Sequence, residues 1–425
     1  MSEMSYLEKL LDGVEVEWVT LGSMADIGTG SSNRQDESEN GIYPFYVRSK
    51  NILKSDTFEF DEVAIVIPGE GGIGDIFHYV EGKYALHQRA YRIRITTNAV
   101  DTKFLYYFMS SSFKQYILTK SVGATSISIR KPMLEGFKVP IPCPNDPEKS
   151  LAIQAEIVRI LDKFTALTAE LTAELTAELT MRKKQYNYYR DQLLSFDEEQ
   201  EKPIYLEKLL DGVEVEWLPL GVLGELVRGN GLPKTDFTEA GIPAIHYGQI
   251  YTFYGLSTET TKSFVSQDTA KKLKKVNTGD VVITNTSENL DDVGKALVYL
   301  GKEQAVTGGH ATIFKPNKGI IGKYFAYFTQ TNSFFNEKRK YSKGTKVIDV
   351  SASDMAKITI PIPCPNNPEK SLAIQSEIVR ILDKFDTLTN SITEGLPREI
   401  ELRQKQYEYY RDLLFSFPKP ETVSN

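Results

Sequence analysis

Few residues of this chain have the spacing of a recognised catalytic or cofactor site. Gly69-Glu-Gly-Gly-Ile-Gly74 fits the bare glycine pattern of a dinucleotide-binding turn. Pro68 separates it from the preceding predicted strand, and no helix pattern follows it, so we interpret it as a glycine-rich turn. None of the Gly-Lys pairs is followed by Ser or Thr, which excludes a P-loop. Asp75, Glu81 and Lys83 have the residue types of a metal-dependent nuclease site, but the second half of the chain has no counterpart.

Composition favours binding over catalysis. The 425 residues are 41% hydrophobic and 25% charged, as in ordinary globular proteins, and no apolar run approaches the roughly 18 residues of a membrane span. Two cysteines exclude a disulfide scaffold and a cysteine-based zinc site, and four histidines do not favour a histidine-rich metal site. These counts lead us to expect a protein that binds no metal. The first residues lack the basic and apolar stretches of a signal peptide, so we expect a cytoplasmic protein.

Positive charge is concentrated in the same part of each half of the chain. Residues 83–138 contain 10 Lys and Arg against 2 Asp and Glu, and residues 304–359 contain 9 against 3. Residues 1–82 have the opposite balance, 5 against 16, and the net charge of the chain is −7. Clustered basic residues attract the phosphates of nucleic acids, so the two windows predict two DNA-facing surfaces. A solvated face without a nucleic-acid partner is the alternative.

Side chains that could read base edges lie in predicted loops in or near these windows. Arg pairs well with guanine, and Asn or Gln pairs with adenine. No single residue carries a specific signal, so we treat them as one set of candidates. The predicted DNA contacts are His87, Gln88, Arg89, Arg92, Arg94, Lys120, Thr125, Ser126, Ser128, Arg130, Asn230, His246, Tyr247, Gln249, Asn285, Thr286, Ser287, His310, Lys343, Thr345 and Lys346.

The chain is internally duplicated. Three blocks recur nearly unchanged: Tyr6–Trp18 as Tyr205–Trp217, Ile141–Phe164 as Ile362–Phe385, and Lys184–Phe196 as Lys405–Phe417. Between them lie two dissimilar stretches, which we call module 1 (about 22–140) and module 2 (about 221–361). Near-identity in the flanks and divergence between them indicate that the flanks do one shared job and the modules different ones. Recent duplication with neutral drift is the alternative.

Both modules have mixed secondary-structure signals. Glu62–Ile67 and Asp280–Thr284 read as buried strands. Helices are predicted over Thr102–Thr119 and Gly322–Asn336. Each module is therefore expected to combine strands and helices.

The repeated flanks that follow the modules predict long helices. Asp146 and Asn367 are suited to cap a helix, and a proline follows each at the first helical position. Three consecutive TAEL tetrapeptides, Thr168–Leu179, extend the first helix with strong helix formers. Gly395 and Pro397 predict a kink or break near residue 394 in the second helix.

Apolar residues four apart form a stripe along each helix. The stripe positions are Leu167, Leu171, Leu175 and Leu179 and, 221 residues later, Leu388, Ile392, Leu396 and Ile400. A stripe of this length needs a partner, and the other helix supplies one in a two-helix coiled coil. Packing of each helix on its own module is the alternative.

These features resemble the specificity subunits of type I restriction–modification systems over essentially the whole chain. The residues that carry the resemblance are Trp18, Leu21-Gly22, Gly41-Ile-Tyr-Pro, Gly241-Ile-Pro, Gly279-Asp280-Val-Val-Ile, Pro140-Ile-Pro with Gln154, Ile157 and Leu161, and Pro361-Ile-Pro with Gln375, Ile378 and Leu382. The tandem TAEL repeat is similar to the spacer repeat of the type IC subgroup.

The resemblance implies an α+β fold with an internal pseudo-twofold duplication. Two mixed α/β target recognition domains would be separated by two long antiparallel helices that form a coiled coil. The expected segments are recognition domain 1 (1–145), helix 1 (146–198), recognition domain 2 (199–366) and helix 2 (367–425). Each domain would read one half of a bipartite, asymmetric DNA site, and the helices would set the gap between the halves.

The resemblance also implies a non-catalytic subunit of a larger complex. Two modification subunits, which methylate adenine with S-adenosylmethionine, would bind the helices. Two restriction subunits, which use ATP and Mg²⁺, would join them, and this chain would bind no cofactor. From the residues alone, a helical scaffold that joins protein partners without binding DNA is the alternative, which the two basic windows disfavour.

Overall fold

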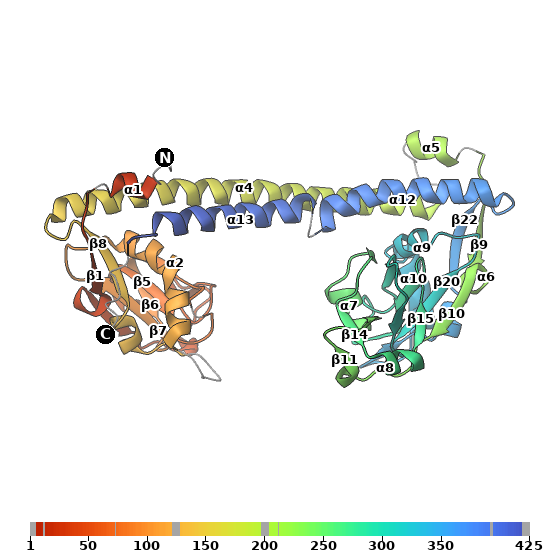
Figure 1. Cartoon of the computed structure of the whole chain (residues 1–425), viewed down its shortest axis with the longest axis horizontal. Coiled ribbons are helices and arrows are strands. Elements are labelled where there is room, and N and C mark those ends of the chain that lie inside the picture. Colours follow the sequence, from red (N-terminus) through yellow and green to blue (C-terminus); the bar gives the residue numbers. More distant parts are fainter. Residues whose placement is uncertain are drawn as a thin grey trace. The chain divides into compact units, whose positions relative to one another are not determined.

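The computed structural model describes residues 6–418 except 12, 73, 121–127, 197–203, 211 and 392–393. The chain forms two compact units: unit 1 contains residues 1–173 and 401–425, and unit 2 contains residues 174–400. Each unit holds one module together with parts of the long helices (Figure 1). The units therefore cut across the four segments expected from the sequence.

Unit 1 is built on one six-stranded sheet. Its elements are α1 (Tyr6–Leu10), β1 (Val16–Thr20), β2 (Ala25–Thr29), β3 (Tyr43–Tyr46), β4 (Leu53–Ser55), β5 (Phe60–Pro68), β6 (His78–Leu86), β7 (Ala90–Ile95), α2 (Thr102–Lys120), α3 (Lys131–Glu135), β8 (Lys138–Pro142), the first part of α4 (Pro147–Ser195) and most of α13 (Gly395–Leu414). The strand order is β2-β7-β5-β6-β3-β4, and β1 pairs with β8 in a separate antiparallel ladder. All neighbours in the sheet are antiparallel except β3 and β6.

Helix α2 covers one face of this sheet and connects it to α4. Buried Ile65 of β5 belongs to the same hydrophobic core as Phe104 of α2. On the other side of α2, Lys103 Nζ and Tyr107 Oη each donate a hydrogen bond of 2.8 Å to Asp162 of α4. Module 1 is therefore fastened to the first repeated helix by apolar packing and by one carboxylate.

Unit 2 repeats this plan with different residues. Its elements are the remainder of α4, α5 (Ile204–Leu210), β9 (Val215–Pro219), α6 (Leu220–Leu223), β10 (Gly224–Arg228), β11 (Phe237–Thr238), β12 (Ile242–Ile245), α7 (Tyr247–Thr252), β13 (Ser257–Thr258), β14 (Ser263–Val265), α8 (Gln267–Lys272), β15 (Lys274–Val276), β16 (Val281–Thr284), β17 (Thr286–Ser287), β18 (Ala296–Tyr299), β19 (Ala305–Thr307), β20 (Ala311–Pro316), α9 (Gly322–Phe328), α10 (Asn332–Tyr341), β21 (Ile348–Asp349), α11 (Ala352–Met355), β22 (Thr359–Pro363) and α12 (Pro368–Asn390). Lys323 and Tyr327 of α9 bind Asp383 of α12, as Lys103 and Tyr107 bind Asp162.

The two modules share a strand topology that their sequences do not reveal. The order β10-β20-β16-β18 in unit 2 corresponds to β2-β7-β5-β6 in unit 1. The parallel pair of β12 with β19 corresponds to that of β3 with β6. The long strand β6 has two counterparts, because the segment 300–304 separates β18 from β19. The mixed α/β fold class expected from the sequence is confirmed in both units.

Most predicted elements are confirmed, with one correction. Strands β5 and β16 cover the predicted runs, and α2 coincides with the helix predicted from Thr102. The helix predicted over Gly322–Asn336 is instead two helices, α9 and α10. Thr331 interrupts it, because its hydroxyl accepts a hydrogen bond from Phe334 N and caps α10.

The third repeated block of each half packs in the other module. Leu414, Phe415 and Phe417 at the end of the chain belong to the hydrophobic core of unit 1. Their counterparts Leu193, Leu194 and Phe196, at the end of α4, belong to the core of unit 2. Each unit is therefore completed by a segment from the other half of the duplicated sequence.

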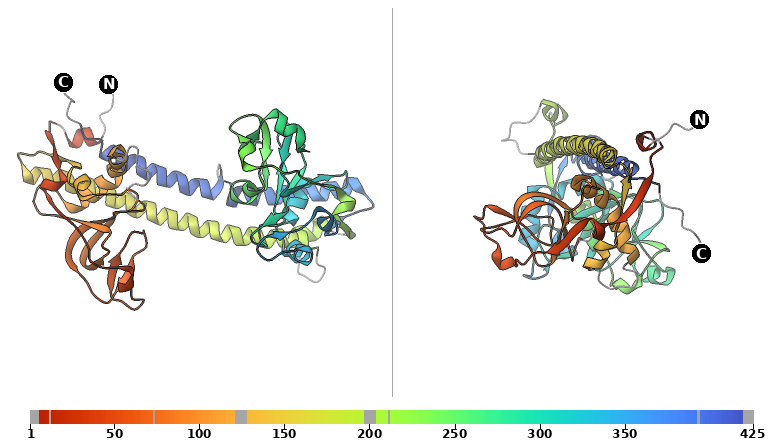
Figure 2. Two further views of the ribbon diagram at one scale, coloured as in Figure 1. Left: turned by 90° about the horizontal axis from the view of Figure 1, so that it is seen from below. Right: turned by 90° about the vertical axis from the view of Figure 1, so that its left-hand side faces the viewer.

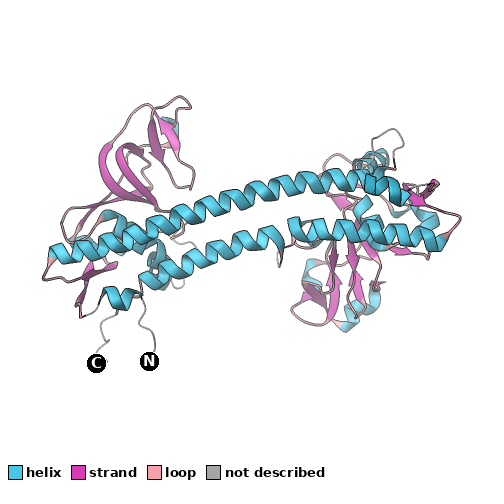
Figure 3. Cartoon of the chain, turned by 90° about the horizontal axis from the view of Figure 1, so that it is seen from above, coloured by secondary structure: helices cyan, strands magenta, loops and turns pink. Residues whose placement is uncertain are grey.

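The long helices pair in antiparallel fashion within each unit. In unit 1, Phe164 of α4 stacks on Tyr410 of α13 at 5.7 Å between ring centroids. In unit 2, Tyr189 of α4 stacks on Phe385 of α12 at 5.5 Å. Figures 2 and 3 show α4 as one continuous helix alongside each partner. The Asp146 side chain caps α4 by accepting a hydrogen bond of 3.0 Å from Lys149 N.

The predicted break in the second helix is present. Helix α12 ends at Asn390 and α13 begins at Gly395, which has φ of +77°. A Cβ atom at this position would lie 2.4 Å from the carbonyl oxygen of Thr387, so only glycine fits. Pro397 lies in the first turn of α13, where a missing N–H is tolerated. The break therefore depends on the glycine.

The apolar stripe is only partly buried. Leu396 is buried, but Leu167 is 51% exposed, so the prediction that Leu167 packs between helices is wrong. Residues four apart advance faster than the 3.6-residue turn, so such a stripe rotates away from any one partner. The stripe residues of intermediate solvent exposure are Leu171, Leu175, Leu179, Leu388 and Ile400. Ile392 lies outside the described residues.

Candidate nucleic-acid interface

One edge of module 1 gathers polar side chains from the ends of four strands. We call it rim 1, and it consists of Asn33, Arg48, Glu70, His87–Arg89 and Ser128. Ser32, after β2, pairs with His87 in the turn between β6 and β7, and Glu70, after β5, pairs with Ser128. The sheet order therefore places residues together that lie up to about a hundred positions apart.

Rim 1 has a carboxylate held between two arginines. Glu70 accepts hydrogen bonds from Arg48 at 3.1 Å and from Arg89 at 3.2 Å, and all three side chains are 44–55% exposed. Gln88 donates a 2.6 Å hydrogen bond to Asn33. These groups could pair with guanine, cytosine or adenine edges.

His87 lies beneath this surface as a neutral ring. Burial, and then the charges of Arg48 and Arg89, lower the pKa of His87 from its ordinary value. Its Nδ1 accepts a hydrogen bond from the backbone N–H of Arg89 at 3.0 Å, which assigns the ring hydrogen to Nε2. His87 thus fixes the conformation of the turn that presents Gln88 and Arg89.

The corresponding edge of module 2 has a different character. We call it rim 2, and it consists of Asn230, Tyr247, Thr286–Asn289, His310 and Lys343. His310 and Thr286 share a hydrogen bond of 2.7 Å, and the rings of His310 and Tyr247 lie 4.8 Å apart. Aromatic and hydroxyl groups surround His310 here, whereas a carboxylate and a second guanidinium group lie beside Arg89 in rim 1.

Backbone hydrogen bonds show that the two rims are equivalent. Gly69 N donates to Arg89 O at 2.9 Å, and Ile129 N donates to Gly69 O. In unit 2, Asn285 N donates to His310 O at 2.9 Å, and Val350 N donates to Asn285 O. Arg89 and His310 therefore occupy the same position in the two modules.

This equivalence explains a correction to the predicted contacts. Asn285 is fully buried, and neither atom of its amide has a partner among the described residues. At the same position in module 1, a Cβ on Gly69 would lie 3.2 Å from the ring of Tyr91. In module 2 the smaller Thr312 stands at the position of Tyr91. Asn285 is a core residue, so its predicted readout role is not supported.

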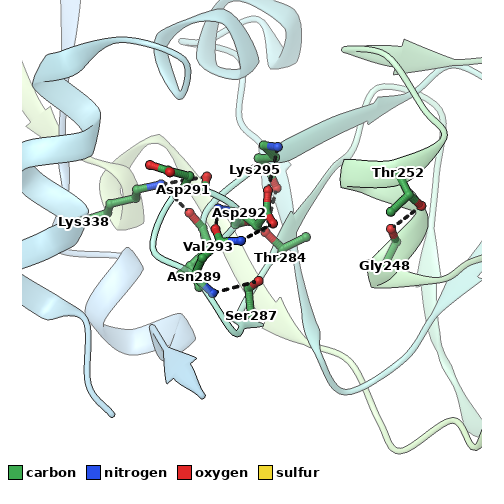
Figure 4. A network of polar contacts seen from close by, with 10 residues as sticks. All are labelled: Gly248, Thr252, Thr284, Ser287, Asn289, Asp291, Asp292, Val293, Lys295 and Lys338. Atoms are coloured by element: carbon green, nitrogen blue, oxygen red, sulfur yellow. Dashed lines mark hydrogen bonds and ion pairs between the residues drawn. The ribbon is translucent and has the colours of Figure 1, made fainter. Parts of the chain in front are cut away.

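Lys338 holds the loop that carries the exposed part of rim 2 (Figure 4). Lys338 as a whole residue is 4% exposed. Its Nζ donates hydrogen bonds to the carbonyl oxygens of Val293 at 2.6 Å and Asp291 at 3.3 Å. Asn289 and Asp292 exchange two hydrogen bonds of 2.8 Å within the same loop. The loop is therefore held by contacts within the protein.

The basic window of module 1 is largely neutralised in the fold. Arg92 contacts Asp26 at 2.6 Å and Glu62 at 3.2 Å, and only 14% of its side chain is exposed. Arg94 lies 3.8 Å from the same glutamate. Both arginines are on the middle of β7 and not on rim 1. The acidic strands of residues 1–82 pair with the basic strand, so net charge along the sequence overstated the positive surface.

The remaining predicted contacts are divided between the rims and the interior. Ser128 and Arg130 are exposed near Glu70, and Lys120 lies at the end of α2 above the Tyr116 ring. Ser287 is mostly buried beside Thr286. The predicted residues that form other contacts are His246 (ring against Tyr247), Gln249 (bonded to Ser263), Asn230 (bonded to the Lys272 carbonyl) and Lys343 (paired with Asp354). Thr345 and Lys346 are exposed, and Thr125 and Ser126 lie outside the described residues.

Sequence reasoning missed several rim residues. Arg48, Glu70 and Asn33 belong to rim 1, and Arg228 joins rim 2 by binding Asp349 at 3.0 Å and the Gly309 carbonyl at 3.1 Å. Each lies at or just beyond a strand end, which was the available signal. Their grouping depends on strand order, which local patterns do not encode.

No group of three or more His, Cys, Asp or Glu side chains in the described part of the chain could hold a metal ion. Among the same residues, none of the helices combines the length and apolarity needed to cross a membrane.

Comparison with known proteins decides the family. The family model described as the type I restriction modification DNA specificity domain matches residues 13–181 and 213–402. The chain belongs to this family. These two matches include most of both modules and of both long helices, in agreement with the duplicated fold. The role of this specificity subunit is DNA sequence specificity in a type I restriction–modification system.

One relative of this specificity subunit matches it from end to end. The EcoR124I/EcoR124II specificity subunit of Escherichia coli is 38% identical over 444 residues, covering 100% of both chains. The EcoprrI specificity subunit of Escherichia coli is 32% identical and covers 93% of both. A chain from a structural study of complex assembly and conformational transition of the type I system has a TM-score of 0.58 at 15% identity, covering 94% of this chain and 97% of the other.

Proposed function

We propose that each module reads one half of a bipartite, asymmetric DNA site through its rim. The observation that carries this proposal is the equivalence of the two rims in backbone topology, combined with their different chemistry. Arg89 beside Glu70 suits guanine and cytosine edges, whereas His310, Thr286 and Tyr247 offer neutral donors, acceptors and a stacking ring. One scaffold that presents two unlike sets of groups would select two unlike half-sites.

The long helices in this proposal set the gap and bind the partner subunits. Near-identical helical blocks in both halves suit two copies of one partner, the modification subunit, which would supply S-adenosylmethionine chemistry. Two restriction subunits, which use ATP and Mg²⁺, would complete the complex in the cytoplasm. The chain itself would be non-catalytic and bind no cofactor. The TAEL tandem supports a place in the type IC subgroup.

The test is genome-wide mapping of adenine methylation in cells that express this chain with its cognate modification subunit. The wild-type chain should direct methylation to one split motif that is absent without it. Arg89→Ala should relax the motif in one half only, and His310→Ala should relax the other half. Lys302→Ala is a matched control, because Lys302 is exposed in the segment between β18 and β19, at the end of β19 opposite His310.

Two outcomes would contradict the proposal. A split motif that is unchanged by both variants would remove the rims from DNA reading. A change of both halves by one variant would contradict the assignment of one half-site to each module. Recovery of the assembled complex must accompany each result, so that loss of folding is distinguished from loss of reading.

A further inference from the structure

A cavity of about 530 Å³ lies in unit 2 among the end of α4, the middle of α12 and α5. Its lining residues are Arg182, Gln185, Tyr189, Gln192, Leu193, Tyr205, Arg380, Ile381, Lys384, Phe385 and Leu388. We call it groove 2. None of its lining residues belongs to rim 1 or rim 2, and the proposed reading of DNA does not use it.

Groove 2 has an apolar floor and a cationic border. Leu193 is 5% exposed, and Phe385 stacks on Tyr189 with ring planes 28° apart. Three cations and no carboxylate belong to its lining. Such a surface fits a ligand that carries both negative charge and a bulky apolar group.

Two of the three cations of groove 2, Arg182 and Arg380, are held by ion pairs with Glu178 and Glu377. Glu377 binds Arg380 through two hydrogen bonds of 2.7 Å, and the Tyr205 hydroxyl donates to the same carboxylate. Arg380 first, and then Tyr205, lower the pKa of Glu377 to about 2, so the carboxylate stays ionised. Lys384 is exposed, and its amine makes no hydrogen bond or ion pair with the described residues. One cation is therefore oriented and another is open to a ligand.

Unit 1 contains nearly the same residues at the equivalent positions of the repeat. The counterparts of the lining, in the same order, are Arg403, Gln406, Tyr410, Leu413, Leu414, Tyr6, Arg159, Ile160, Lys163, Phe164 and Leu167. Ten of the eleven are identical, and Leu413 in place of Gln192 is the one difference. We call this set groove 1.

The local geometry of groove 1 repeats that of groove 2. Arg159 binds Glu156 through two hydrogen bonds of 2.6 Å, and Tyr6 donates to Glu156 at 3.0 Å. Phe164 stacks on Tyr410 with ring planes 20° apart. The next stretch of α4, Thr168–Leu179, has diverged from residues 389–400 at most positions. The grooves have kept their residues while the adjoining stretch of sequence has changed.

We infer that each groove docks an acidic, amphipathic segment of a partner protein. A carboxylate of the segment meets Arg380 and Lys384, and a large apolar side chain enters between Leu193 and Phe385. In groove 1 the same groups are supplied by Arg159, Lys163, Leu414 and Phe164. This inference rests on the proposed function in one respect, which is that the partner is the modification subunit.

Two features favour protein over DNA as the occupant. The floor is apolar and aromatic, whereas a phosphate needs polar donors and gains nothing from a buried leucine. The grooves are nearly identical, whereas the DNA-reading rims are unlike each other. Two equal grooves suit two copies of one protein.

The test uses the full chain and its cognate modification subunit. Lys163→Glu and Lys384→Glu place a negative charge in groove 1 and groove 2, and both side chains are exposed, so the fold should persist. We expect each single variant to weaken the binding of one modification subunit at least about tenfold, and the double variant to weaken both. Native mass spectrometry at graded concentrations measures the stoichiometry. Lys183→Glu is the matched control, because Lys183 is an exposed lysine of α4 outside the lining.

The outcomes separate this inference from the proposed function. Unchanged stoichiometry with the double variant would overturn the grooves as docking sites. The stoichiometry could instead stay unchanged while the slope of log DNA affinity against log salt falls by about one phosphate contact per groove. That result would assign the grooves to binding of the DNA backbone. The assembly measurement needs no DNA, so it gives its answer whether or not the wild-type complex methylates a split motif.

Discussion

Glu70 decides how much positive charge rim 1 presents, because it lies between Arg48 and Arg89. With the carboxylate in place, both guanidinium groups are partly satisfied inside the protein. Glu70 can also accept a hydrogen bond from the exocyclic amine of cytosine. Glu70 therefore lowers the affinity of rim 1 for phosphate, and it offers an acceptor that favours cytosine.

We predict that Glu70→Gln strengthens salt-dependent DNA binding and alters one half-site. Two released arginines should make the slope of log affinity against log salt steeper by about 1 to 2. Fluorescence anisotropy of the assembled complex at several salt concentrations measures the slope. Glu81→Gln, an exposed change on β6 outside rim 1, is the control. An equal slope in both variants would refute the role given to Glu70.

The burial of Lys338 leads us to expect that the stability of unit 2 depends on pH. Burial lowers the pKa of its amine from 10.5 to about 8. Between these two values the unfolded chain binds more protons than the folded one, so stability rises with pH. Below about pH 8 both states are protonated, and this contribution is constant.

We expect the free energy of unfolding of the wild-type chain to rise relative to that of Lys338→Met between pH 8 and pH 10. Urea unfolding of both proteins across this range gives the difference, and titrations common to the two cancel. The loss of two hydrogen bonds in the variant costs about 1–3 kcal/mol and does not by itself vary with pH. A constant difference would show that Lys338 titrates normally.

At the scale of elements, α4 is the feature that links the two halves of the duplicated chain. It is one helix of 49 residues, whereas its counterpart is divided into α12 and α13 at Gly395. A TAEL repeat of four residues contributes about 6 Å of helix length. At a rise of about 3.4 Å per base pair of DNA, that length corresponds to one to two base pairs.

We predict that deletion of Thr176–Leu179 shortens the gap of the recognised DNA site by about one base pair and leaves both half-sites unchanged. Methylation mapping of the deletion variant measures the gap and the half-sites together. Thr176→Ala keeps the length of α4 and serves as the control. A methylated motif with its original gap would exclude the TAEL tandem as a determinant of spacing.

At the scale of the whole molecule, the exchange of terminal segments makes the two units depend on distant parts of the sequence. Phe415 packs edge-on against Phe104 at 5.6 Å and Phe108 at 5.5 Å in unit 1. Leu194, its counterpart by sequence, is fully buried in unit 2. Each module thus needs a helix end from the other half of the duplication.

We predict that Phe415→Ala destabilises the N-terminal module by about 3–5 kcal/mol, although the residue lies near the end of the chain. Hydrogen exchange should increase in β5 and α2 and remain unchanged in β16 and α9. Leu194→Ala is the reciprocal control and should affect β16 and α9 by about 2–5 kcal/mol. Faster exchange of β16 in Phe415→Ala would contradict the exchanged packing.

Features encoded by neighbouring residues were determined by the sequence alone. The repeats, the cap at Asp146, the break at Gly395, the strands β5 and β16 and the mixed fold class could all be predicted. Each depends on local hydrogen bonding, backbone freedom or periodicity within a few turns of chain.

Only the tertiary structure decided which of the candidate residues face outward together. Strand order brought Ser32 to His87 and Glu70 to Ser128, and it buried Asn285 that the loop pattern had marked as a contact. Pairing of β2 and β5 with β7 placed Asp26 and Glu62 against Arg92 and removed the apparent positive charge. The physical reason is that burial and ion pairing depend on contacts between residues far apart in sequence, which local propensities do not specify.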